Sequence, residues 1–146
     1  MAISSSTVTT SFKTQVLQGT HNFTASSGDT FKIALYTNSS SLAASTATYG
    51  DGTATNEVSG SGYSAGGNTL TSVTPVADGT VAVCDFADTS WTSATITAYG
   101  ALIYNSSESN KSVCVLNFGG DKTCTSGTFT IQFPTADASN AILRLA

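Results

Sequence analysis

Apolar and polar side chains alternate along several short segments of this chain, which is the pattern of a strand with one buried face. Phe129, Ile131 and Phe133, for example, alternate with Thr130 and Gln132. The segments that read as strands are 31–37, 70–76, 80–87, 93–105, 112–119, 127–134 and 141–145. Short strands at such intervals are typical of an antiparallel sandwich or a jelly-roll-like barrel. The sequence therefore predicts an all-β fold over 30–146.

One segment near the start has helical spacing instead. Phe12 and Val16 are four residues apart, and Leu17 widens the apolar stripe that they form. Gly19 stands where a left-handed residue commonly ends a helix. We predict one N-terminal amphipathic helix over about 7–18. Because its Thr-rich sequence favours helix only weakly, packing of the apolar stripe must stabilise it, and we expect Phe12, Val16 and Leu17 to contribute to an interface.

A long polar, Gly-rich stretch at about 38–69 interrupts the strand pattern. Loops of this length inside a compact domain are usually functional or form extended excursions. Tyr49, Val58 and Tyr63 are its prominent apolar groups. We expect the stretch to be an arm or surface loop that orders against a neighbouring subunit through these three side chains.

The segment 100–105 is apolar at both odd and even positions, so we expect a strand that is covered on both faces, by sheet and helix or by a neighbouring subunit. The composition supports an ordered fold, because 40% of the residues are hydrophobic although only 10% are charged. With 146 residues, the chain 1–146 is predicted to form a single domain.

The charge pattern bears on partners and location. The net charge is −4, and the five basic residues are scattered, whereas nucleic-acid binding requires a concentrated basic face. No segment resembles a secretory signal or a membrane span. We therefore expect neither nucleic acid nor membrane as a partner. Weak self-repulsion at such low charge favours dense packing in an assembly.

Candidate catalytic and metal-binding residues are few. Asp85 and Asp88 could form a metal site or an acid/base pair, but they, like Asp121, lie at predicted strand ends and turns, where Asp commonly bonds to the backbone. His21 is the only histidine, and no pattern supplies the partners that a general base or a zinc site requires. We predict no catalytic, cofactor-binding or metal-binding residues, and no enzymatic activity.

The three cysteines and the aromatic residues allow two readings each. Cys84 and Cys114 lie in strand-like runs as small buried hydrophobes, although a bridge between Cys114 and Cys124 is an alternative. Reduced thiols fit folding in a reducing cytoplasm. Trp91 and the five tyrosines suit either a sugar-binding platform or the core of a sandwich.

Several segments resemble a family of small structural proteins of tailed bacteriophages. The likeness covers most of the chain and is carried by FKTQVLQGTHNF (12–23), TFKIALYT (30–37), NEVSGSGYSAGGNTLT (56–71), DFADTSWTSATITAYGALIYN (85–105) and the segment 115–146. Proteins of this type are virion components without chemistry, found as capsid decoration (cement) or as tail and fibre parts.

The resemblance implies a non-enzymatic virion protein that is made in the host bacterial cytoplasm. It would stabilise the shell by binding the major capsid protein or other virion proteins, and it would form a homo-oligomer, with a trimer favoured. The alternative is a tail or fibre component with a role in binding host glycans.

Overall fold

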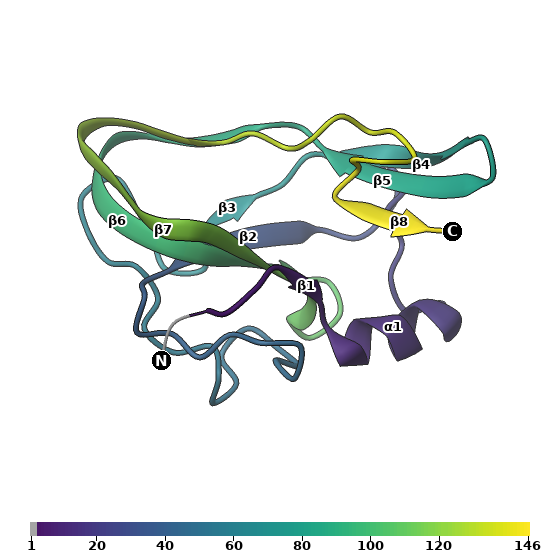
Figure 1. Ribbon diagram of the computed structural model, residues 1–146, viewed down its shortest axis with the longest axis horizontal. Helices are drawn as coiled ribbons and strands as arrows, with labels where there is room; N and C mark the ends of the chain where they lie inside the picture. Colours follow the sequence, from purple (N-terminus) through teal and green to yellow (C-terminus); the bar gives the residue numbers. More distant parts are fainter. Residues whose placement is uncertain (1–2) are drawn as a thin grey trace.

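The computed structural model describes residues 3–146 and arranges them as two antiparallel sheets that lie face to face (Figure 1). One sheet has the strand order β1-β7-β6-β2-β3 and the other β4-β5-β8. The elements are β1 (Thr7–Val8), α1 (Thr10–Leu17), β2 (Phe31–Tyr36), β3 (Asn68–Thr69), β4 (Ser72–Asp78), β5 (Val81–Phe86), β6 (Thr89–Asn105), β7 (Lys111–Ile131) and β8 (Leu143–Leu145). The predicted all-β sandwich with an N-terminal helix is confirmed; a jelly-roll-like connection stays a prediction.

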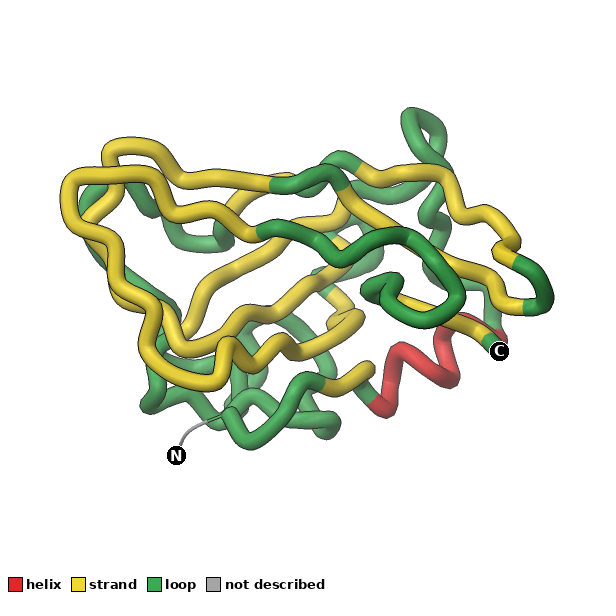
Figure 2. The backbone as a smooth tube through the Cα atoms, turned by 45° about the horizontal axis from the view of Figure 1, so that its top comes forward, coloured by secondary structure: helices red, strands yellow, loops and turns green. Residues whose placement is uncertain are grey.

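Strands β6 and β7 form one long hairpin that belongs to both layers. They pair along their whole length, from Thr89 opposite Ile131 to Asn105 opposite Lys111. Figures 1 and 2 show the hairpin running along the upper layer, bending at one end of the molecule and continuing in the lower layer. The sandwich is therefore closed at this end by continuous strands.

A bulge in β7 makes the bend. Ala98 pairs with Lys122 but Gly100 pairs with Asn117, so β7 has extra residues at this point, including Gly119 at φ +74°. Such bulges bend a strand and increase its twist. The sequence predicted a turn here between two separate strands, 112–119 and 127–134, and that prediction was wrong. Gly-rich sequence marks a bulge within a strand as well as a turn between strands.

The core lies between the two sheets. Both contribute fully buried side chains, such as Phe31 and Ile33 from β2 and Phe86 from β5. Trp91 is also part of this core and is only 4% exposed, so it offers no sugar-binding platform. Of the residues predicted to lie in a strand covered on both faces, Ala101 and Ile103 face this core.

The other face of that strand is covered by the chain's own loop. Leu102 and Tyr104 of β6 pack with Tyr36 of β2 and with Leu42, which is 2% exposed. Figure 1 shows the segment that follows β2 lying beneath the lower sheet. The strand is therefore covered on both faces as predicted, but by residues 38–56 of the same chain.

A carboxylate organises this loop. Asp51 accepts hydrogen bonds from the backbone N–H of Ala47 (2.6 Å) and of Thr53 (2.8 Å), and from the Thr53 hydroxyl (2.6 Å). Burial raises the pKa of Asp51, but these bonds and one from Thr48 outweigh it and lower the pKa to about 2. The loop is thus held by polar contacts within the chain.

The rest of the long stretch, 57–69, runs along the edge of β2. The backbone N–H of Val58 donates to the carbonyl of Leu35 (2.9 Å), and the Val58 side chain is 4% exposed in the main core. Gly66 and Gly67 form a turn, at φ +91° and +72°. A Cβ at Gly67 would lie 1.7 Å from the carbonyl oxygen of Ile33, so only glycine fits there. Residues 38–69 are therefore a loop packed on its own sheet and not an extended arm, while contact of this loop with a neighbour stays a prediction.

The packing of the loop predicts a large stability difference between two leucine variants. Leu42→Ala removes a fully buried side chain and should lower the free energy of unfolding by about 2–5 kcal/mol. Leu17→Ala removes a side chain that is 90% exposed and should change it by no more than about 0.5 kcal/mol. Urea denaturation of both variants measures the two values. Equal effects would show that the loop does not pack as described.

Candidate docking surface

Helix α1 is shorter than predicted because the residues before it form an edge strand. Thr7 pairs with Val115 and Val8 with Cys114, so the helix begins only at Thr10. At the other end the N–H of Thr20 donates to Gln15 and that of Gly19 to Val16, with Gly19 at φ +70°. This is a Schellman motif, which confirms the predicted role of Gly19.

The three helix residues predicted to form an interface lie at increasing distance from the core. Phe12 is 6% exposed, and its ring centroid lies 4.9 Å from that of His21 and 6.0 Å from that of Phe23. Val16 is half-buried, and Leu17 is 90% exposed. Phe12 thus belongs to the chain's own core, which corrects its assignment as an interface side chain, while Leu17 stays available to a partner.

A groove with apolar walls separates α1 from the small sheet. It has a volume of about 500 Å³, and Leu17 and Leu145 stand at its rim, 90% and 63% exposed. We call it the α1–β8 groove. Its lining consists of Val8, Phe12, Lys13, Val16, Leu17, His21, Phe23, Pro75, Ala82, Val83, Cys84, Leu143, Arg144 and Leu145. Exposed apolar surface gathered in a groove is typical of a binding site.

The sequence did not indicate the second wall of this groove. Leu143 and Leu145 were recognised as part of a strand, but nothing in the sequence relates that strand to the N-terminal helix. Lys13 and Arg144 were likewise missed, although they are the two permanent charges in the lining. Only the packing of β8 beside β5 places them opposite the helix.

His21 lies at the inner end of the groove within a polar network. Its Nε2 lies 2.8 Å from Oε1 of Gln15, and its Nδ1 accepts from the amide of Asn105 at 3.0 Å. The same amide donates to Asp29 at 2.7 Å. Because Nδ1 accepts, the ring proton lies on Nε2 and the ring is neutral. The network ties the helix to the end of β6.

Tyr49 and Tyr63 are held by a second carboxylate far along the loop. Glu57 accepts from the hydroxyls of Tyr49 (2.8 Å) and Tyr63 (2.7 Å) and from the N–H of Gly66 (2.7 Å). Burial, together with the bond to Glu57, raises the pKa of Tyr49 to about 12. Tyr49 also stacks on Tyr104, with ring centroids 4.7 Å apart. Tyr49, Val58 and Tyr63 therefore pack on their own chain, and contact of the two half-buried tyrosines with a neighbour stays a prediction.

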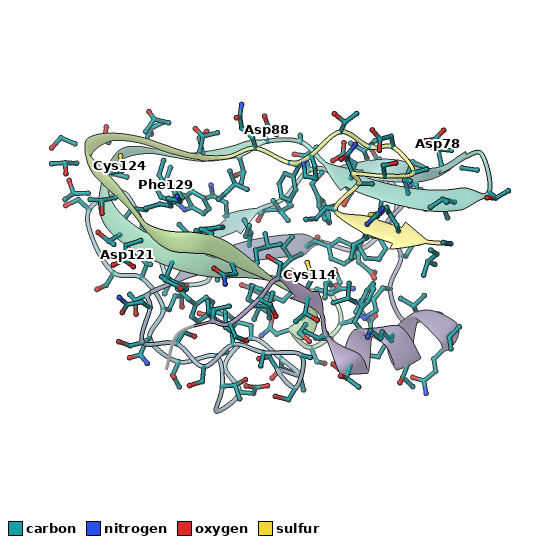
Figure 3. The ribbon with its side chains drawn as sticks, in the orientation of Figure 1. Asp78, Asp88, Cys114, Asp121, Cys124 and Phe129 are labelled. Carbon is teal, nitrogen blue, oxygen red and sulfur yellow. The ribbon has the colours of Figure 1, made fainter. Side chains whose placement is uncertain are left out.

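Asp88 and Asp121, two of the acids weighed as candidates for chemistry, lie apart from each other. Figure 3 shows Asp88 on the upper layer and Asp121 at the bend of the hairpin. Asp88 accepts from the N–H of Phe133 (2.9 Å), and Asp121 accepts from the amide of Asn38 (3.4 Å). Over residues 3–146, no three His, Cys, Asp or Glu side chains come together as a possible metal site.

The three cysteines are free thiols. Cys114 and Cys124 lie in different parts of the molecule, Cys114 in the lower sheet and Cys124 near the bend (Figure 3), so the alternative of a bridge between them is not realised. Burial raises the pKa of Cys84 and of Cys114 to about 12. Both thiols are therefore protonated at neutral pH and act as small apolar core residues.

No helix within the described part of the chain is long and apolar enough to cross a membrane. Comparison with known proteins found no matching family model, no matching curated protein and no matching solved structure.

The position of His21 predicts an acid-sensitive stability. Burial and the charge of Lys111 lower the pKa of His21 below its ordinary value of 6.5, against the opposing effect of Asp29. The unfolded chain then binds a proton at a higher pH than the folded chain does. The free energy of unfolding should have its highest value above pH 6.5 and should decrease as the pH falls below that value.

Urea denaturation at a series of pH values between about 7.5 and 5 tests this. His21→Gln keeps a polar side chain but cannot titrate, so the stability of this variant should change much less over the same interval. Because His21 is the only histidine, an unchanged pH profile in the variant would contradict the assignment.

Proposed function

We propose that this chain is a non-enzymatic structural protein of a bacteriophage virion, a capsid decoration (cement) protein that stabilises the shell by binding neighbouring capsid subunits. The α1–β8 groove is the observation that carries the proposal. Leu17 is apolar and exposed beside a hollow with apolar walls. Covering it with a partner protein removes apolar surface from water, which favours binding. A protein that acts by adhesion needs such a surface.

The scarcity of charge supports the same proposal. With 10% charged residues and a net charge of −4, copies of the chain repel one another only weakly when they are crowded on a particle. A trimer around a local symmetry axis is the favoured arrangement, since closed cyclic oligomers are usual in such assemblies. The resemblance of the sequence segments to structural proteins of tailed phages points in the same direction.

A tail or fibre component that binds host glycans is the second candidate. A separate hollow of about 520 Å³ is lined by Phe118, Phe129 and Phe133 together with Asn117 and Gln132. Aromatic faces beside amide groups are what sugar rings require. Quantitative mass spectrometry of purified particles separates the two candidates, because on the order of hundreds of copies indicate the head and a handful indicate the tail.

Particles that lack this protein, mixed with the purified chain, test the role of the groove. Leu17→Glu places a charge at the groove rim and should weaken binding about tenfold or more, without a change in thermal stability. Thr125→Glu adds the same charge at an exposed position near the hairpin bend and serves as the matched control. Binding by Leu17→Glu that equals binding by Thr125→Glu would contradict the proposal.

A further inference from the structure

The α1–β8 groove is one part of a longer furrow along one side of the sandwich. A second hollow, of about 400 Å³, shares Val8, Leu143 and Arg144 with the groove. The hollow lined by phenylalanines, of about 520 Å³, shares Ile142 with the second. Each hollow therefore adjoins the next in space. We call the three together the furrow.

Two strand edges bound this furrow. β1 is the outermost strand of the five-stranded sheet, and β8 is the outermost strand of the three-stranded sheet. Val8 of β1 and Leu143 of β8 line the same hollows, so the two edges lie on opposite sides of the furrow (Figure 1). Within residues 3–146, β8 pairs with no strand other than β5. The free side of β8 offers backbone groups to which an extended peptide can bind.

The charges along the furrow are of one sign. Lys13, Lys122 and Arg144 line it, which is three of the five basic residues of the chain. None of the nine acidic residues belongs to the lining of any of the three hollows. Arg144 donates to the carbonyls of Ala138 (3.1 Å) and Ser139 (2.7 Å) and lies near the carboxylate of Asp137, so Lys13 and Lys122 are the exposed cations that a partner can meet. Complementary charge on a partner speeds association and fixes the register of binding.

We propose that the furrow binds an extended segment of a partner protein in which apolar and acidic residues alternate, added as a strand at the free edge of β8. The apolar side chains of the segment enter the hollows. The acidic side chains, which point the opposite way in an extended chain, pair with the long side chains of Lys13 and Lys122 at the rim. This inference rests on the docking role proposed for the α1–β8 groove and adds the chemistry of the partner.

The test uses labelled peptides of about seven residues, the length of an ordinary strand. One alternates Val with Glu, a second alternates Val with Lys, and a third contains the residues of the first in scrambled order. Fluorescence anisotropy should show the Val/Glu peptide binding about tenfold or more tightly than either of the others. Hydrogen exchange should show new protection at β8, which a merely electrostatic contact would not produce.

Charge-reversal variants supply the matched control. Lys13→Glu and Lys122→Glu, both at exposed positions, should weaken binding of the Val/Glu peptide and strengthen binding of the Val/Lys peptide. Lys111→Glu reverses a charge outside the furrow and should leave both affinities unchanged. Equal affinity for all three peptides would overturn the proposal. So would peptide binding that leaves hydrogen exchange at β8 unchanged.

Two other occupants of the furrow have their own outcomes. Dimers in light scattering, with β8 protected before any peptide is added, would assign the furrow to a second copy of the chain and overturn the proposal. The second is a fatty acid. Binding of laurate without binding of the Val/Glu peptide would assign the furrow to such a ligand and would also overturn the proposal. Loss of particle binding by Leu17→Glu together with failure of the peptides would reject this inference and leave the proposed function standing.

Discussion

The bent hairpin of β6 and β7 is the constraint on which the rest of the structure depends. Its two halves lie in different layers, so the position of the bend sets the separation of the sheets and the shape of the core between them. The bend depends on close backbone approach. A Cβ on Gly100 would clash with the carbonyl oxygen of Leu116 and with the side chain of Ile3. Only glycine therefore fits where β6 and β7 approach each other so closely.

A hairpin of this length exposes two broad faces, and the chain covers the outer one at considerable entropic cost. Ordering a loop costs about 1–2 kcal/mol per residue in backbone entropy. Burial of Leu42, stacking of Tyr49 on Tyr104 and the bonds to Asp51 and Glu57 offset this cost. Asp51 and Glu57 thus organise the loop, because one carboxylate can accept several hydrogen bonds at once.

The side of the sandwich that carries the α1–β8 groove remains open, and apolar side chains are exposed there. Leu17 and Leu145 face solvent there beside a hollow with apolar walls. The helix that forms one wall is anchored to the core by Phe12 and by the His21 network, so its contacts are in place without a partner. Rigid surfaces lose little entropy on binding, and this favours their use in adhesion.

Local patterns in the sequence determined the fold class, most of the strands and the end of the helix at Gly19, because side-chain periodicity and glycine conformation act over a few residues. They did not determine which segments share a layer. Gly119 and Gly120 were interpreted as a turn because a bulge and a turn have the same composition, and only the pairing of β6 with β7 distinguishes them. The covering loop and the groove were missed for a related reason. Tyr49 and Val58 are apolar in either setting, and whether they face their own sheet or a neighbour depends on contacts between residues far apart in the chain, which only the tertiary structure decides.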